Sequence, residues 1–117
     1  MNGVHIMADC HGCRGNLINL DIIRDLCNNA VIDSGLTIVT QAWHKFPGDQ
    51  SGVTGAVVLA ESHLAIHTWP EIGKTTLDIY VCNYSKDNSL NAEQVLLTII
   101  NYLSPEVTER HTINRGM

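Results

Sequence analysis

The chain has 117 residues and a net charge of −5 at pH 7, and 44% of its residues are hydrophobic while 16% are charged. This length and balance predict one ordered domain over residues 1–117, and the small charged fraction favours an oligomer over a monomer. The twelve acidic and seven basic residues form no basic cluster, which argues against nucleic-acid binding, and no apolar run is long enough to span a membrane.

The first part of the chain contains one strand pattern and one helix pattern. Residues 3–9 are predicted to form a strand, because apolar residues alternate with others there. The glycine-containing segment CHGCRGN ends this strand. Residues 21–34 carry apolar side chains at helical spacing, which predicts a helix that Asn19 caps at its start and Gly35 ends.

The rest of the chain is richer in strands. Strand-forming residues recur at 36–46, 53–59, 63–69 and 75–82, and the segment PGDQSG forms a loop after the first of these. A second helix is predicted at 89–103, and the tail EVTERHTI adds an edge strand; the inward face of that helix is expected to hold Leu90, Val95, Leu96, Ile99, Ile100 and Leu103. Consecutive strands with short connections pair antiparallel. The predicted fold class is therefore α+β, a two-layer sandwich with two helices on one face of a mainly antiparallel sheet.

The segment AESHLAIHTWPE places a serine and two imidazoles close together in a strand-like stretch. Side chains alternate along a strand, so Ser62 and His67 have opposite parity. A turn at Ser62 would expose the peptide bond after Glu61 and let His67 fold back toward it. A serine beside a base can attack an external carbonyl, as in a hydrolase, or the carbonyl of its own preceding residue. The hydrolase pattern G-x-S-x-G is absent, and an ordinary turn serine is the plain structural alternative.

This segment closely resembles the self-processing site of the prokaryotic S-adenosylmethionine decarboxylases, which are pyruvoyl enzymes. The resemblance extends through SGLTIV, HKF and GVTG before the site and LDIYVC after it, with a weaker match in HIMADCHGC. It implies a proenzyme that cuts itself between Glu61 and Ser62, giving chains 1–61 and 62–117. It also implies a dimer of processed protomers with active sites at the interface.

By this resemblance, the Ser62 hydroxyl attacks the Glu61 carbonyl, His67 is the processing base, and Ser62 becomes a covalent pyruvoyl group. Decarboxylation of an amino acid needs an electron sink that no side chain supplies, and a ketone that forms a Schiff base with the substrate amine provides one. An imidazole is a suitable base near neutral pH. Cys82 matches the family's proton donor, and a thiol is a weak acid suited to that step.

The resemblance further implies S-adenosylmethionine as the substrate and spermidine biosynthesis as the use of the product. Phe46 matches the family's adenine-stacking position, and Glu71 is a reasonable acceptor for ribose hydroxyls. Trp69 is a candidate for lining the same pocket, with core or interface packing as its alternative. Aromatic faces suit both an adenine and a sulfonium cation.

Two other functions stay open. Relatives on this scaffold include pyruvoyl enzymes for ornithine or arginine, and Asp49, in a loop somewhat longer than the family's usual one, is a candidate for binding such a basic side chain. Thr54 follows this loop where a serine is common. The other alternative is a thiol or metal-binding module built on CHGC, or a structural homologue that does not process itself.

The cysteines give little support to that last alternative. The chain lacks the layout of a signal peptide, so we expect a cytoplasmic protein whose cysteines are thiols. C-x-x-C at Cys10 and Cys13 is typical of thiol oxidoreductases, but the predicted helix begins about eight residues later. A zinc site needs two more ligands, and His63 and His67 would lie about 13 Å apart on a strand, so no metal is expected. Cys27 is expected to lie in the core.

Overall fold

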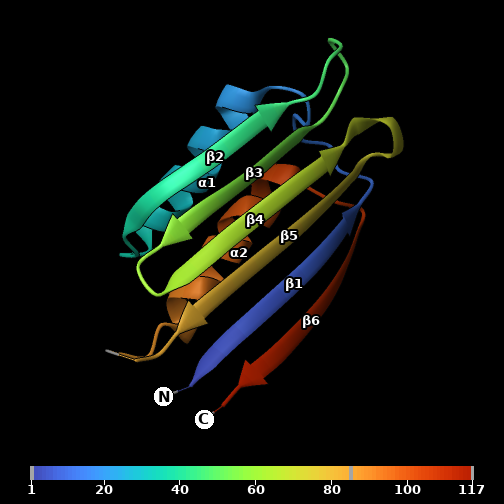
Figure 1. The fold of residues 1–117 in the computed structure, drawn as a ribbon. Helices are drawn as coiled ribbons and strands as arrows, with labels where there is room; N and C mark the ends of the chain where they lie inside the picture. Colours follow the sequence, from blue (N-terminus) through green and yellow to red (C-terminus); the bar gives the residue numbers. More distant parts are fainter. Residues whose placement is uncertain (1, 85, 117) are drawn as a thin grey trace.

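The computed structural model describes residues 2–84 and 86–116, which form one antiparallel sheet and two helices (Figure 1). The elements in chain order are β1 (Gly3–His11), α1 (Leu20–Asp33), β2 (Ile38–Lys45), β3 (Val53–Leu59), β4 (Ser62–Trp69), the 3₁₀ turn η1 (Pro70–Ile72), β5 (Lys74–Cys82), α2 (Ser89–Leu103) and β6 (Val107–Arg115). The six strands are ordered β2-β3-β4-β5-β1-β6, and every neighbouring pair is antiparallel. The predicted α+β sandwich is confirmed, including the edge strand at the tail.

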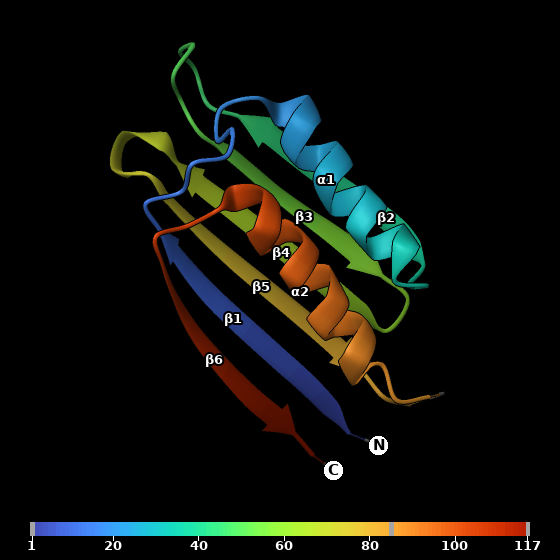
Figure 2. The same ribbon diagram turned by 180° about the vertical axis from the view of Figure 1, so that it is seen from behind.

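Both helices cover the same face of the sheet (Figure 2). Helix α1 packs on β2 and β3, and α2 packs on β5 and β1. The core between the layers is formed by branched aliphatic side chains, the largest of which include Ile23, Leu64, Ile66, Leu77, Ile79, Leu96, Ile99 and Leu103. No helix in the described residues has the length and apolar character needed to span a bilayer.

The helix ends follow the local sequence. The Asn19 side chain accepts a hydrogen bond from the Ile22 N–H at 3.1 Å, which caps α1 as predicted. Gly35 follows the last turn with φ +82°, a conformation that glycine adopts at little cost, so it ends α1 as predicted. Helix α2 has the predicted bounds, but the inward placement of Leu90 is wrong. Leu90 lies in the first turn on the outer side and is 82% exposed.

Within the described residues, nothing covers the other face of the sheet, which we call the open face (Figure 1). Alternate residues of each strand point to it, among them Thr54, Ala65, Asp78 and Met7. The cross-strand register places all six histidines of the chain on this face: His5, His11, His44, His63, His67 and His111. The open face is therefore rich in groups that accept and donate protons.

Candidate active site

The turn between β3 and β4 has two residues, Ala60 and Glu61, and joins Leu59 to its pairing partner Ser62. Glu61 has φ +65°, in the left-handed region that side chains with a Cβ rarely adopt. A single such residue costs roughly 1 kcal/mol. The Ala60 N–H donates to the Thr37 carbonyl at 3.0 Å, which holds the turn in place. The strained residue is the one whose carbonyl precedes Ser62.

Ser62 is the first residue of β4, and its side chain is buried on the side of the helices. Its Oγ accepts a hydrogen bond from the backbone N–H of Cys82 at 3.3 Å. The Cys82 carbonyl in turn accepts a hydrogen bond from Nδ2 of Asn88, which is also buried, at 3.0 Å. The fold thus brings Ser62 and Cys82, two of the residues singled out in the sequence, into contact. Asn88 supports them and was not identified from the sequence.

His67 does not fold back toward Ser62, so that expectation is wrong. Strand β4 runs without interruption from Ser62 to Trp69, and the turn precedes Ser62. At the usual rise per strand residue, the two Cα atoms lie about 16 Å apart. His67 also faces the open side of the sheet, whereas Ser62 faces the helices. A single chain therefore does not join this imidazole to this hydroxyl.

The partner of His67 within the chain is Thr54. The two residues are directly opposite on β4 and β3, and Oγ1 of Thr54 lies 3.1 Å from Nδ1 of His67. The hydroxyl fixes the ring orientation and leaves Nε2 for another group. The two-residue turn at Ala60 and Glu61 determines this pairing, so counting outward from that turn is the signal that would have revealed it.

Phe46, Trp69 and Glu71, the predicted substrate-binding residues, lie together. They line a cavity of about 300 Å³ at the end of β4 remote from Ser62, together with Gln50, Ser51, Gly52 and Thr68. An exposed aromatic ring, a half-exposed indole and a carboxylate thus border one hollow. The exposed Asp49 does not line this cavity, although its neighbour Gln50 does.

Two further residues, Trp43 and Cys27, have structural roles. Trp43 lies across the Gly55 backbone, where any larger residue would collide with its ring, and its indole N–H donates to Gln41 at 2.8 Å. Cys27 is fully buried in α1 as expected, and burial raises the pKa of its thiol to about 12.

The sequence and fold of the chain are similar to those of known proteins. Residues 4–116 match the sequence model of the family described as S-adenosylmethionine decarboxylase. The S-adenosylmethionine decarboxylase proenzyme of Thermoanaerobacter sp. (strain X514) is 43% identical over 81 residues, which cover 68% of this chain and 64% of that protein. The aligned part thus spans just under two thirds of that relative's length.

Other relatives align over nearly the whole chain. The proenzyme of the same name from Pelotomaculum thermopropionicum is 35% identical over 116 residues, covering 98% of this chain and 84% of that protein. The crystal structure of the adenosylmethionine decarboxylase from Aquifex aeolicus VF5 superposes with a TM-score of 0.87 at 34% identity, covering 98% of this chain and 91% of that one. The chain belongs to the S-adenosylmethionine decarboxylase family.

Proposed function

We propose that this chain is a self-processing proenzyme whose mature form decarboxylates S-adenosylmethionine, and that the product serves spermidine biosynthesis. The observation that carries the proposal is the position of Ser62. This residue is buried, it directly follows the left-handed Glu61 in a tight turn, and its Oγ is held by the N–H of Cys82. Membership of the family supports the same activity.

Cleavage begins with attack of the Ser62 Oγ on the Glu61 carbonyl carbon. The new C–O bond replaces the C–N bond, so the peptide becomes an ester and the Ser62 amine is freed. Removal of the Ser62 α-proton then expels the Glu61 carboxylate, and hydrolysis with loss of ammonia leaves a pyruvoyl group. The left-handed conformation of Glu61 favours this sequence, because opening the turn releases its strain.

The surroundings of Ser62 fit a pyruvoyl group. Loss of the Ser62 nitrogen would remove the terminal Leu59–Ser62 pair, but the pairs from Val58–His63 to Thr54–His67 would still hold β4 against β3 and position 62 at its start. The backbone N–H of Cys82, now bonded to the hydroxyl, would remain available to an oxygen there. In the mature enzyme the pyruvoyl carbonyl would supply the electron sink for loss of CO₂. Cys82 would return a proton to the substrate α-carbon, and Phe46, Trp69 and Glu71 would hold the adenosyl part.

Ser62 and His67 lie too far apart within one chain for His67 to act on Ser62, and a second copy of the chain would supply the missing imidazole. We propose a homodimer in which the open faces meet, so that His67 of one copy removes the α-proton of Ser62 in the other. The cavity lined by Phe46, Trp69 and Glu71 lies at the same end of the sheet as His67. Together with His67, it would belong to the active site around Ser62 of the other copy. A hydrogen-bonded Thr54–His67 pair on an uncovered sheet face supports this arrangement. The interface would then complete each active site.

The substrate is tested by CO₂ release from S-adenosylmethionine, ornithine and arginine, each labelled at the carboxyl carbon. We expect release from S-adenosylmethionine alone, and none from any substrate with the Ser62→Ala variant. Release from ornithine or arginine alone would overturn the proposed substrate while leaving the pyruvoyl chemistry intact. The position of Asp49 outside the cavity gives those two basic substrates no specific support.

A further inference from the structure

Cys10 and Cys13 form a pair of thiols outside the proposed active site. Cys10 is the last residue of β1 whose side chain faces the helices, and it is fully buried in the core. Gly12, with φ +67°, then turns the chain, and Cys13 follows in the loop with its thiol half-buried. The pair has no role in the proposed cleavage or decarboxylation.

The side chains of Cys10 and Cys13 lie near each other beside Thr75. Cys10 is the direct cross-strand partner of Thr75 on β5, and both side chains face the helices. Cβ atoms of such partners lie about 5 Å apart. Sγ of Cys13 lies 3.7 Å from Oγ1 of Thr75 and 3.6 Å from the Cys10 carbonyl oxygen. The Cys13 thiol therefore borders the same space as the Cys10 side chain.

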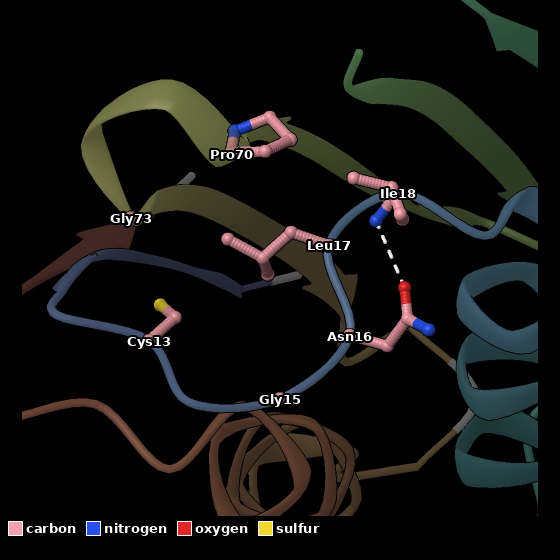
Figure 3. A pocket seen from close by; sticks show the side chains of 7 residues that line it. All are labelled: Cys13, Gly15, Asn16, Leu17, Ile18, Pro70 and Gly73. Atoms are coloured by element: carbon pink, nitrogen blue, oxygen red, sulfur yellow. Dashed lines mark hydrogen bonds between the residues drawn. The ribbon is translucent and has the colours of Figure 1, made fainter. Parts of the chain in front are cut away.

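Only one of the two thiols is open to small molecules. The side chain of Cys13 lines a cavity of about 280 Å³ between the loop after β1 and the turn at η1, beside Leu17, Pro70 and Gly73 (Figure 3). The backbone N–H of Cys13 donates to the Gly73 carbonyl at 2.9 Å, which fixes the loop against that turn. Cys10 lies behind it and is not exposed. An external reagent would react with Cys13 first, and the buried Cys10 would then react only with the modified Cys13.

We propose that Cys10 and Cys13 are a modification site that forms a reversible intramolecular disulfide with low-molecular-weight disulfides. Cys13 attacks such a disulfide, RSSR, to give a Cys13–SR mixed disulfide and one RSH. Cys10 then attacks the Cys13 sulfur, which forms the Cys10–Cys13 bond and releases the second RSH. The pair is oxidised by two electrons and RSSR is reduced to two thiols, so atoms and electrons balance.

The environment of the pair makes this reaction slow at neutral pH. Burial raises the pKa of both thiols, that of Cys10 to about 11, and repulsion between the two sulfur charges adds to the shift of Cys10. The thiolate is the reactive form, so oxidation should accelerate by roughly tenfold for each pH unit between about pH 7 and 9. In the described part of the chain, no third His, Cys, Asp or Glu completes a metal site with the pair. A dithiol reaction suits this pair better than metal binding.

The test is to treat the full chain with glutathione disulfide at pH 8, block free thiols with an alkylating reagent, and digest with trypsin. Residues 1–14 form one tryptic peptide, because Arg14 is its first basic cleavage residue, and it contains Cys10 and Cys13 but no other cysteine. We expect this peptide to lose both alkylation sites and to be about 2 Da lighter than the dithiol, with dithiothreitol reversing the change. The mass and alkylation of this peptide do not depend on self-cleavage or on activity. A negative result would therefore count against the disulfide and not against the proposed function.

Two variants sharpen the result. Cys27→Ala, which removes a buried thiol from α1, should leave the disulfide in the peptide. Cys13→Ser should leave Cys10 reduced, because the buried thiol meets no reagent directly. A wild-type peptide that keeps two alkylated cysteines, or carries glutathione on Cys13 without forming the internal bond, would overturn the proposal.

Discussion

Ser62 and His67 lie on the same strand but on opposite faces of the sheet, with four residues between them. If each active site combines Ser62 of one copy with His67 of the other, two inactive variants should complement each other. Ser62→Ala and His67→Ala should each remain uncut when produced alone. Produced together in equal amounts, they should form mixed dimers in which roughly half of the His67→Ala chains are cleaved.

Denaturing electrophoresis with a tag on one variant measures this complementation. The control is a mixture of tagged and untagged His67→Ala chains, in which no copy supplies His67. Persistent absence of cleavage in mixtures that contain folded mixed dimers would argue against a site shared between two chains.

Cys82→Ala should separate cleavage from turnover. The group that holds the Ser62 hydroxyl is the backbone N–H of residue 82, which the substitution leaves in place, so the chain should still be cut. Loss of a positioned proton donor should lower kcat by about 100-fold or more. Cleavage is measured by intact mass and turnover by CO₂ release. An uncut Cys82→Ala chain would assign the thiol to processing instead.

Phe46→Ala should weaken substrate binding without affecting cleavage. Stacking of a base on an aromatic ring contributes about 1–3 kcal/mol, which corresponds to a rise in KM of about 5- to 150-fold. Ile72→Ala is a matched control, because Ile72 is an exposed apolar residue in the neighbouring turn and does not line the cavity. Steady-state kinetics of both variants give the comparison. Equal KM values for the two would remove Phe46 from the adenine site.

The two processed chains should remain bound to each other without a covalent link. Chain 1–61 holds β1, α1, β2 and β3, and chain 62–117 holds the remaining elements. Strand β1 of the first chain lies between β5 and β6 of the second, while β3 pairs with β4 at the cut turn. The chains are therefore interleaved, and they should co-elute in native size-exclusion chromatography and separate only in denaturant. Separation of the smaller chain in native buffer would be inconsistent with this sheet order.

Glu93 on α2 and Arg110 on β6 tie the edge strand to the helix, and their pairing should show in the pH dependence of stability. The hydrogen bond from Arg110 lowers the pKa of the Glu93 carboxyl. The stabilisation by the Glu93–Arg110 pair is therefore fully present above about pH 4.5, the ordinary pKa of a glutamate. It is lost as the pH falls through the lowered pKa of Glu93 in the folded chain. Glu93→Gln should cost up to about 1 kcal/mol at pH 7, because the pair is partly exposed, and less at pH 3. Urea unfolding at both pH values measures this difference, and an equal loss at both would assign the effect to packing.

Most of the fold could be predicted from the sequence because each element carries its own signal. Helix α2 was predicted with its observed bounds, and the cap at Asn19 and the end at Gly35 were identified from residue type alone. Leu90 is an exception that its spacing explains. At about 100° per residue it lies about 180° around α2 from the buried Ile99, on the side of the helix that faces away from the core.

The candidate site could be predicted as a set of residues but not as an arrangement. Ser62, His67 and Cys82 were identified by their resemblance to a family motif, which carries no distances. Alternation along the strand already indicated that Ser62 and His67 face opposite ways. The bend that was expected to unite them is absent, because the chain turns before Ser62 rather than at it. The Thr54–His67 pair depends on the register across two strands, which the segment around Ser62 does not contain.

The most direct test of self-processing is the intact mass of the purified chain under denaturing conditions, before and after borohydride treatment. Cleavage between Glu61 and Ser62 predicts two species, residues 1–61 and residues 62–117, of which only the second carries a carbonyl that borohydride reduces. Ser62→Ala should give one species that borohydride leaves unchanged. A wild-type protein that remains a single chain of 117 residues with no reducible carbonyl would contradict the proposed chemistry.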